Sequence, residues 1–555
     1  MKATGAEIVV QLIKREGVSI VTGIPGGSNL PLYDALYNSG LHHVLSRHEQ
    51  GAGFIAQGIA RSTGRPGVCI ATSGPGATNL LTAIADAKLD SVPIVAITGQ
   101  VSRGLLGTDA FQEVDTYGMS LPVVKHSYLV RSARELLSVI PEAFRIAISG
   151  RPGPVLVDIP KDVLLEGAEF DVWPERSVSD TPLMPDPAAI EAAAAMLEES
   201  RRPFLYFGGG VVSSGAHEEL ARLSRKAAIP AASTLMGLGC LPPGHPLYLG
   251  MIGMHGSRAV NLLAEEADLF IAVGARFDDR ATGDPRRFAR SARVIHIDAD
   301  DAEINKIRVS ELGIHADARE ALAALSDLAR ARDGGEWASR ARELIASSSL
   351  PESDEASHPR EIVRAIARAA GPDAIVTTDV GQHQMWAAQA YPVSRPRSFL
   401  TSGGLGTMGF GLPAAIGAAL ANPGRRIVCI TGDGSLLMNV QELATLAELG
   451  LDVSVFVFDN GRLGLVRQQQ ELFYGGRYSA SRFESRIDFA AIARGFGIEA
   501  ENAEAADEAG TALAITRASG GRGPRLLSLV IREEENVLPM VPPGGANVDA
   551  IAEDA

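Results

Sequence analysis

The chain has 555 residues, of which 46% are hydrophobic and 21% charged, and its formal net charge is −15. An acidic chain without a long basic run is not expected to bind nucleic acid or an anionic membrane surface. With no secretory signal, no apolar segment long enough to span a bilayer, and three cysteines spaced for neither a metal nor disulfides, we expect a cytoplasmic protein with buried thiols.

A chain of this length exceeds a single hydrophobic core, and three blocks are predicted, each alternating short apolar strands with helical stretches. We place the blocks at residues 1–165, 188–335 and 360–541, followed by a polar tail at 542–555. Polar, Pro-bearing segments at 166–187 and 347–359 are predicted as linkers. The predicted fold class is therefore α/β, with three doubly wound parallel-sheet domains.

The first block contains an acid–base candidate, Glu49, where the polar turn at 47–49 passes into a small, apolar, helical stretch. A carboxyl group placed there is expected to be partly desolvated and able to share a proton near neutral pH. The alternative interpretation is an ordinary glutamate in a first helical turn, favoured by the helix dipole. This block is predicted to close with a strand at residues 154–160.

The second block has predicted strands at 204–207, 269–273 and 294–297, and three glycines, Gly208 to Gly210, follow the first of them. No Gly-x-Gly-x-x-Gly occurs at that turn, so the usual dinucleotide-binding motif is weak here. A Gly/Pro-rich turn at 150–154 precedes the last strand of block one, and a similar one at 521–524 precedes the last strand of block three. The similarity of these two turns is either a trace of duplication or a coincidence, since such turns are common before strands.

The third block carries two oxygen donors, Asp433 and Asn460, each in a turn after an apolar run. The runs at 426–430 and 453–458 are typical of buried parallel strands, with a helix predicted at 441–449 between them. Both donors are therefore expected at the C-terminal ends of neighbouring strands, where open α/β sheets bind ligands. One carboxylate and one amide suit Mg²⁺, which completes its shell with water and phosphate, and nearby glycines let backbone N–H groups approach a diphosphate. The alternative is a pair of ordinary turns after strands.

The spacing of Gly-Asp-Gly and Asn resembles the magnesium-diphosphate signature of thiamine diphosphate enzymes. Across nearly the whole length, the chain resembles the catalytic subunits of acetohydroxyacid (acetolactate) synthases, and the ordered set of motifs is far more specific than any single glycine turn. The motifs are Gly23–Gly27, Arg47–Ala52, Ser73–Asn79, Gly107–Glu113, Asp158–Val163, Gly253–Gly256, Gly274–Arg280, Asp379–Trp386, Gly404–Gly409 and Leu472–Gly475.

The resemblance implies that block one binds the pyrimidine end of thiamine diphosphate and block three its diphosphate. Each site would be shared by two subunits of a homodimer or tetramer. Glu49 would hydrogen-bond to the pyrimidine, because a carboxylic acid there favours the imino form that deprotonates the thiazolium carbon. Asp433 and Asn460 would hold Mg²⁺, and Met408 would prop the cofactor in its bent form. The other positions that match the diphosphate site are Gln382, His383, Gly432, Gly434 and Ser435.

The resemblance also implies two 2-ketoacid substrates. Arg280 would recognise the carboxylate of the second one, because its planar fork matches a carboxylate bidentately. Without the resemblance, Lys161 and Arg280 would be interpreted as solvated surface charges, and Asp279 beside Arg280 could form an ion pair with it. The matching positions are Gln112, Lys161 and Arg280 in the reaction site, and Gly27, Phe111, Met254, Leu465 and Gln469 along the substrate pocket.

Block two resembles the family's FAD-binding domain. Joining two ketoacids with loss of CO₂ transfers no net electrons, so the flavin would have a structural role. The matching positions are Arg151, Gly208, Gly209, Gly210, Thr234, Leu235, Met236, His255, Gly256, Gly274, Ala275, Arg276, Asp278, Asp298 and Asp317.

The function implied by the resemblance is 2-acetolactate or 2-aceto-2-hydroxybutyrate synthesis for branched-chain amino acids, with a small regulatory subunit as partner. Most family members have Trp where this chain has Gln469, as in the isozyme I type, so we expect little preference for 2-ketobutyrate over pyruvate. The alternatives are a catabolic acetolactate synthase, a pyruvate oxidase or a glyoxylate carboligase, although Glu49 disfavours the last. From another class, a non-catalytic nucleotide-binding or scaffold protein could keep the same fold.

Overall fold

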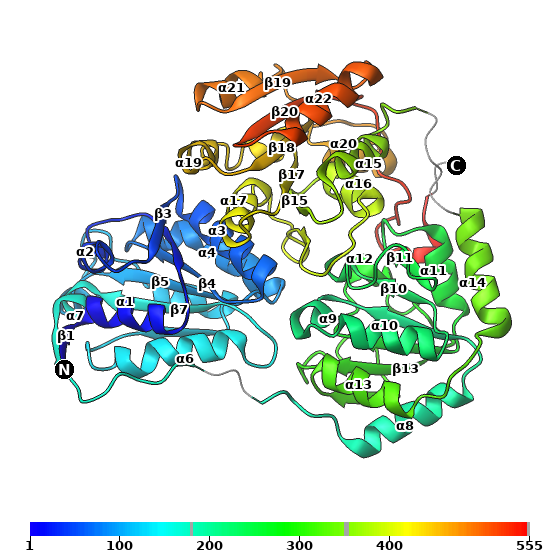
Figure 1. The fold of residues 1–555 in the computed structure, drawn as a ribbon, viewed down its shortest axis with the longest axis horizontal. Coiled ribbons are helices and arrows are strands. Elements are labelled where there is room, and N and C mark those ends of the chain that lie inside the picture. Colours follow the sequence, from blue (N-terminus) through cyan, green and yellow to red (C-terminus); the bar gives the residue numbers. More distant parts are fainter. Residues whose placement is uncertain (178–180, 349–354, 552–555) are drawn as a thin grey trace.

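The computed structural model describes residues 1–177, 181–348 and 355–551, which form three six-stranded parallel sheets flanked by helices (Figure 1). The predicted α/β class with three parallel-sheet domains is confirmed. Nearly all central-strand residues are buried, because the helices cover these sheets and leave little strand surface to water.

The first sheet has the order β3-β2-β4-β5-β7-β6. Helix α1 begins at Gly5 because Thr4 and Glu7 form a capping box, in which each side chain accepts a hydrogen bond from the other residue's backbone N–H. The strands are β2 (Ile20–Gly23), β3 (His42–Leu45), β4 (Gly67–Ala71), β5 (Ile94–Gln100), β6 (His126–Leu129) and β7 (Val155–Pro160). The helices are α1 (Gly5–Arg15), α2 (Leu30–Leu36), α3 (Glu49–Thr63), α4 (Pro75–Leu89), α5 (Thr116–Ser120), α6 (Leu136–Ile148) and α7 (Lys161–Leu165).

The second sheet has the order β11-β10-β9-β12-β13-β14. Numbered within this domain the order is 3-2-1-4-5-6, which is typical of dinucleotide-binding sheets. The strands are β9 (Pro203–Phe207), β10 (Ala231–Ser233), β11 (Tyr248–Met251), β12 (Leu269–Val273), β13 (Arg293–Asp298) and β14 (Leu312–His315). The helices are α8 (Pro187–Glu199), α9 (Gly209–Ser214), α10 (His217–Lys226), α11 (Arg258–Glu266), α12 (Asp279–Thr282), α13 (Ala318–Leu328) and α14 (Gly335–Ser348).

The third sheet has the order β16-β15-β17-β18-β20-β19. The strands are β15 (Ile375–Thr378), β16 (Phe399–Leu400), β17 (Ile427–Gly432), β18 (Val453–Asp459), β19 (Glu499–Glu504) and β20 (Arg525–Val530). The helices are α15 (Pro359–Ala370), α16 (Gln382–Ala390), α17 (Gly411–Ala421), α18 (Asp433–Leu436), α19 (Glu442–Leu449), α20 (Gly464–Phe473), α21 (Phe489–Gly495) and α22 (Glu508–Gly520).

The first and third sheets share one topology. Numbered within each domain, both have the order 2-1-3-4-6-5, and β7 and β20, the strands that follow the two similar Gly/Pro turns, hold the same place in it. This shared topology favours duplication over coincidence as the reason why the two Gly/Pro turns are similar in sequence.

The first and third domains meet through helices α3 and α17, which lie side by side (Figure 1). A Cβ atom at Gly58 would collide with the Ala414 carbonyl oxygen, and one at Gly417 would collide with the Ile55 carbonyl oxygen. Glycine on each helix therefore lets the two backbones touch, which fixes the first domain against the third.

The segments predicted as linkers and tail contain some regular structure. Strand β8 (Gly167–Glu169) in the first linker pairs antiparallel with β1 (Lys2–Thr4), and α14 continues beyond the predicted block end at 335. The tail contains the short helix η4 (Asn547–Asp549). Residues 178–180, 349–354 and 552–555 of these segments lie outside the described residues, and the predicted domain limits stay a prediction.

Candidate functional site

Asp433 and Asn460 lie at the same edge of the third sheet, as predicted. Strands β17 and β18 are paired along their lengths, with Gly432 opposite Phe458, so the two residues follow adjacent strand ends. Asp433 begins helix α18, and both side chains are buried. The carboxylate and the amide are therefore held at the carboxyl edge where this sheet type binds ligands.

The Asp433 carboxylate has one oxygen to which no group of the described residues donates a hydrogen bond. Its Oδ1 accepts a hydrogen bond of 2.8 Å from the Gly434 N–H, whereas its Oδ2 is buried without a hydrogen-bond partner. Burial, with a contribution from nearby Asp459, raises the pKa of Asp433 to about 7. A buried carboxylate oxygen without a partner is costly, so the site fits a cation such as Mg²⁺.

Asp433 should make the metal-free protein less stable at higher pH. Its pKa of about 7 in the folded state lies above the 3.8 of an unperturbed carboxyl. The folded protein therefore keeps this proton between roughly pH 4 and pH 7, where the unfolded chain loses it, and Asp433 lowers the free energy of unfolding as pH rises through that window.

Between about pH 5 and about pH 8, we expect the metal-free wild-type protein to lose more stability than metal-free Asp433→Asn. Mg²⁺ should reduce this difference in pH dependence between the two proteins, because it binds the ionised carboxylate. Thermal unfolding of both proteins at the two pH values, with and without Mg²⁺, measures this. Equal pH dependence in the two metal-free proteins would contradict it.

Asn460 is oriented by a chain of side-chain amides. Its Nδ2 donates to Gln382 Oε1 at 3.2 Å, and its Oδ1 accepts from the Arg462 N–H at 3.1 Å. Gln382 in turn donates to Gln468 Oε1 at 3.0 Å and to the Glu535 carbonyl at 2.7 Å. The hydrogen bond to Gln382 orients the amide, and because the Asn460 oxygen has two lone pairs and accepts from Arg462 with one, the other can bind a metal ion.

His383 is a neutral imidazole packed against the turn that carries Asp433. Burial lowers the pKa of His383 to about 3, and its Nε2 is buried without a hydrogen-bond partner in the described part of the chain. A Cβ atom at Gly432 would lie 2.7 Å from His383 Nδ1, and one at Gly434 would lie 2.8 Å from Leu463 Cδ2. The glycines are needed here for close packing, and the unpartnered nitrogen is free to contact a diphosphate oxygen.

The turn at 432–435 also forms a hydrogen bond with the segment that follows β15. Ser435 Oγ donates to the Val380 carbonyl at 2.7 Å, which joins helix α18 to the segment after β15. One edge of the third sheet thus brings together all the residues predicted for the metal and diphosphate site except Met408. They are Gln382, His383, Gly432, Asp433, Gly434, Ser435 and Asn460.

Asp379, within a motif quoted for the family but not among the predicted site residues, organises the loop that carries Met408. Its carboxylate accepts hydrogen bonds from the N–H groups of Gly409 at 2.7 Å and Gly411 at 3.3 Å. Burial raises the pKa of Asp379 to about 6. An aspartate directly after a buried strand was the available sequence signal, which Asp379 shares with Asp433 although it lacks the flanking glycines.

Glu49 is the first residue of helix α3, so the first-turn position is confirmed. It is half-buried, and its Oε2 accepts a hydrogen bond of 3.0 Å from Asn79 Nδ2. The buried carboxylate of Glu442, in the third domain, accepts hydrogen bonds from the N–H groups of Arg47 at 2.9 Å and His48 at 3.1 Å. Among the described residues, no hydrogen bond or ion pair links Glu49 itself to the third domain.

The loop with Phe111 and Gln112 has a strained backbone. Asp109 and Gln112 have φ of 57° and 60°, a region that non-glycine residues uncommonly adopt. The Glu113 carboxylate holds the loop by accepting from the N–H groups of Thr108 at 3.1 Å and Ala110 at 3.0 Å. Phe111 is 88% exposed, an unusual position for a large aromatic side chain.

The other predicted substrate residues lie on several elements. Lys161 begins α7 and is half-buried, and a Cβ atom at Gly27 would meet no atom within 4 Å. Arg280 is exposed, with its Nη1 3.7 Å from the sulfur of Met254, and Asp279 is 3.8 Å from its Nε. The suspected ion pair is thus present but long and solvated, worth little.

Leu465 and Gln469 lie one helical turn apart on α20 and so share a face. Gln469 is exposed, whereas its neighbour Gln468 is buried. The face that carries the two predicted pocket residues is thus available to a ligand.

Several of the predicted flavin residues lie together at the carboxyl ends of β9 and β12. A Cβ atom at Gly208 or Gly210 would collide with Gly274, and one at Gly209 would lie 3.4 Å from Met236 Cβ. These contacts bring together the turn after β9, the turn after β12 and the short helix η3 (Leu235–Gly237), whose first residue follows Thr234. The tight cradle and the sheet order fit a dinucleotide.

Several of the remaining predicted flavin residues have structural contacts of their own. Asp278 and Asp317 cap helices α12 and α13 by accepting backbone N–H groups, and Asp298 is buried at the end of β13, with a pKa that burial raises to about 6. His255, next to Gly256, is within 3.0 Å of the Pro539 carbonyl. Helix capping is thus an alternative role for two of these aspartates.

Two arginines cross from one domain to another. Arg151 of the first domain forms ion pairs with Asp300 at 3.1 Å and Glu303 at 2.7 Å in the second domain. Arg276, next to Ala275, donates to the Leu89 carbonyl at 2.6 Å. Both predicted flavin arginines therefore lie where the first and second domains meet.

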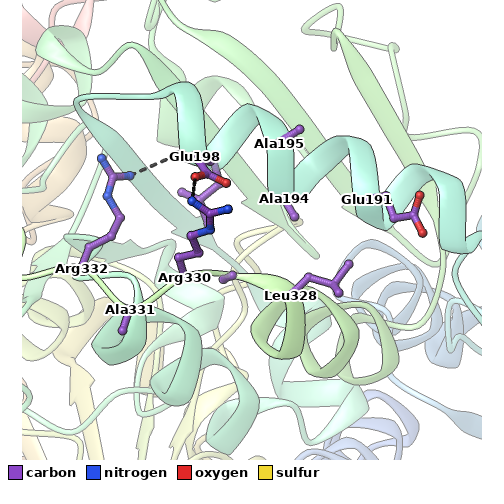
Figure 2. Close-up of a pocket in the computed structure, with 10 residues that line it drawn as sticks. Glu191, Ala194, Ala195, Glu198, Leu328, Arg330, Ala331 and Arg332 are labelled. Atoms are coloured by element: carbon purple, nitrogen blue, oxygen red, sulfur yellow. Dashed lines mark hydrogen bonds and ion pairs between the residues drawn. The ribbon is translucent and has the colours of Figure 1, made fainter.

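A cavity of about 480 Å³ lies away from these residues, between α8 and the segment after α13 (Figure 2). Alanines are four of its ten lining residues, and Glu198 and Arg330 point toward each other as an ion pair (Figure 2). None of the predicted site residues lines it, so it is not the candidate site.

The described part of the chain contains no group of three or more His, Cys, Asp or Glu side chains arranged to hold a metal. Cys69, Cys240 and Cys429 are buried free thiols, as predicted. Within the described residues, no helix is both long enough and apolar enough to cross a membrane.

Comparison with known proteins agrees with this geometry. Three family models match: the N-terminal thiamine pyrophosphate (TPP) binding domain of thiamine pyrophosphate enzymes at residues 3–119, their central domain at 190–325 and their C-terminal TPP binding domain at 379–529. The chain is 52% identical to the acetolactate synthase isozyme 1 large subunit of Escherichia coli over 99% of this chain and 98% of that protein. It is 48% identical to the isozyme 2 large subunit of E. coli over 99% of both, and 46% identical to the acetolactate synthase large subunit of Corynebacterium glutamicum over 99% of this chain and 90% of that protein. The chain therefore belongs to the acetolactate synthase large-subunit family of thiamine pyrophosphate enzymes.

Proposed function

We propose that the protein joins two 2-ketoacids with loss of CO₂. Two pyruvate anions and one proton would yield 2-acetolactate and CO₂, and pyruvate with 2-ketobutyrate would yield 2-aceto-2-hydroxybutyrate, in the synthesis of valine, leucine and isoleucine. The observation that carries the proposal is the buried Asp433–Asn460 pair, whose unpartnered carboxylate oxygen fits Mg²⁺, in a chain that matches acetolactate synthases along its length.

Thiamine diphosphate, when bound, supplies the carbon nucleophile and the electron sink for this chemistry. In our proposal, Asp433 and Asn460 hold the metal, and the neutral His383 and the turn at 432–435 contact the diphosphate. Glu49 shares a proton with the pyrimidine ring, and its hydrogen bond from Asn79 fixes the orientation of the carboxyl group. Arg280 would orient the second ketoacid, because its guanidinium is exposed and its ion pair with Asp279, at 3.8 Å, is long and solvated.

We propose that the working unit is at least a dimer, in which Glu49 of one protomer serves the metal site of the other. Support comes from large hydrophobic side chains left exposed on the loops and helices of the first and third domains, which a second copy would cover. They are Leu30, Leu45, Leu105, Phe111, Tyr117 and Leu121 in the first domain, and Leu405, Met438, Val466, Tyr474 and Tyr478 in the third.

Two further proposals concern a partner subunit and the cellular location of the protein. The most similar relatives reported above are named large subunits, which supports a small regulatory subunit as partner. Three buried free thiols suit a reducing compartment, which supports a cytoplasmic location.

The function is tested by assaying the purified protein for acetolactate with and without thiamine diphosphate, Mg²⁺ and FAD. We expect product formation to require the first two, with bound flavin that is not reduced during turnover. Flavin reduction at the rate of turnover would favour a pyruvate oxidase, and full activity from protein that binds no flavin would favour a catabolic acetolactate synthase.

Replacing Gln469 by Trp should raise the preference for 2-ketobutyrate. A Trp on the exposed face of α20, one turn from Leu465, would offer apolar surface to the extra methyl group of that substrate. One such group is worth roughly 1–3 kcal/mol, which corresponds to about 5- to 150-fold in the product ratio.

The ratio of acetohydroxybutyrate to acetolactate is measured with both acceptors in competition. Gln470→Trp, the adjacent substitution, is the control, because the next residue on a helix points about 100° away. A strong bias toward acetohydroxybutyrate in the wild-type protein, or an unchanged ratio in Gln469→Trp, would refute this assignment.

A further inference from the structure

The loop at residues 401–410, between β16 and α17, is held by a buried charge cluster from another domain. Arg61 on α3 pairs with Asp86 at 3.0 Å on α4 and with Asp90 at 2.8 Å just after α4. The guanidinium and both carboxylates are almost completely buried. Two buried carboxylates facing one guanidinium have more acceptor oxygens than it can satisfy, so they need further hydrogen-bond donors inside the protein.

Those donors come from the loop. Asp90 accepts hydrogen bonds from the N–H groups of Gly403 at 3.0 Å and Gly404 at 2.7 Å. Asp86 Oδ2 accepts from the hydroxyl of Thr407 at 2.8 Å and from that of Ser402. The two carboxylates therefore have all of these hydrogen bonds only when the loop packs against the first domain.

Arg61 contacts the two ends of the same loop. Its Nη1 donates to the Thr401 carbonyl at 3.0 Å, and its guanidinium lies over the Phe410 ring, 4.9 Å from the centroid. Burial raises the pKa of Asp86, and the Arg61 charge opposes that shift. The loop backbone also fits closely, because a Cβ atom at Gly404 would lie 2.8 Å from Leu89 Cβ and 2.9 Å from Asp90 Oδ1.

Beyond this cluster, the loop tip is open to solvent. Leu405 is 42% exposed and Gly406 has a φ of 70°, so local packing does little to fix this part of the loop. Met408 lies one residue after Thr407, and Asp379 holds the next residue, Gly409. The conformation of Met408 is thus determined from two sides, by Asp379 within its own domain and by the charge cluster across the domain boundary.

We propose that Arg61, Asp86 and Asp90 are positioning residues of the cofactor site, which seat the 401–410 loop so that Met408 supports the bound cofactor. They act through the loop and touch neither cofactor nor substrate. The inference rests on the proposed function only for the role of Met408, since the seating of the loop is a property of the protein alone.

The test compares Asp90→Asn and Thr407→Val with the wild-type protein and with Met408→Ala. Thr407→Val removes one donor to Asp86 and leaves every charge in place, so it remains informative if Asp90→Asn folds poorly. Glu501→Gln, which breaks the exposed Arg517–Glu501 ion pair of the third domain, is the control. Three quantities are measured: hydrogen exchange of the 401–410 amides without cofactor, the Kd for thiamine diphosphate with Mg²⁺ by calorimetry, and FAD content with Tm.

We expect loop amides to exchange about tenfold faster in Asp90→Asn, and the Kd for thiamine diphosphate to rise about tenfold in both Asp90→Asn and Met408→Ala, because charge-assisted hydrogen bonds are the strong ones. Thr407→Val should shift both quantities in the same direction by less, and the control should match wild type. A Tm close to the wild-type value in Thr407→Val and Met408→Ala would show that these variants keep their fold.

Unchanged exchange in Asp90→Asn would overturn the inference. Faster exchange with an unaltered Kd, while Met408→Ala binds thiamine diphosphate weakly, would overturn it and leave the proposed function intact. A wild-type protein that binds no thiamine diphosphate would overturn both.

Discussion

Replacing Glu49 by Gln is expected to slow turnover by about 10²- to 10⁴-fold, the usual contribution of a positioned acid–base group. The substitution keeps the size of the side chain and an oxygen for the hydrogen bond from Asn79. It removes the proton that a carboxylic acid can share, so the loss should appear in kcat more than in the affinity for thiamine diphosphate. Steady-state acetolactate formation at saturating cofactor measures it.

Glu7→Gln is the matched control for this substitution. Glu7 is also a first-turn glutamate, on α1, where it completes a capping box with Thr4. If Glu49 served only the helix dipole, both variants would lose a similar small amount of stability, about 0.3–1 kcal/mol, and keep their turnover. Near-wild-type turnover in Glu49→Gln would remove Glu49 from the mechanism.

Replacing Asp433 by Asn should weaken activation by Mg²⁺ by at least about 100-fold, since second-shell changes alone already cost about 10- to 100-fold in metal affinity. The variant fills the same space with a neutral group, so the carboxylate charge that attracts the cation is lost while the fold is kept. Titration of activity with Mg²⁺ at fixed thiamine diphosphate gives the shift.

Asp488→Asn serves as the control for Asp433, because Asp488 is an exposed N-cap of α21 in the same domain, and Asn caps a helix about as well as Asp. Its Mg²⁺ dependence should match wild type. A Mg²⁺ half-saturation in Asp433→Asn within twofold of the wild-type value would exclude Asp433 as a metal ligand.

The metal site was predictable because its signals are local. Two apolar runs specify buried strands, and parallel strands bring the residues after their ends to one edge, so Asp433 and Asn460 could be placed together from sequence alone. The same logic extends to Asp379, which also follows a buried strand but lacks the flanking Gly-Asp-Gly pattern that drew attention to Asp433.

Contacts between distant segments were not predictable. Asp90 meets Gly404 across more than 300 residues, and Glu442 reaches the backbone of Arg47 across nearly 400, although neither acidic residue stands in an unusual local pattern. Such contacts arise from the packing of α3 on α17, which depends on glycines that look unremarkable in the sequence. The predicted substrate residues present the same difficulty, because Phe111 is 88% exposed and so has little packing among the described residues to fix its position.

The most direct test of a site shared between protomers is the activity of mixed dimers of Glu49→Gln and Asp433→Asn. Each variant alone should be nearly inactive, yet a heterodimer would contain one site with both substitutions and one site with neither. Random assembly from equal amounts makes half of the dimers mixed, so the shared-site arrangement predicts about one quarter of the wild-type activity. If Glu49 and Asp433 of the same chain formed one site, every site would carry a substitution, and a mixture no more active than the separate variants would contradict the shared site.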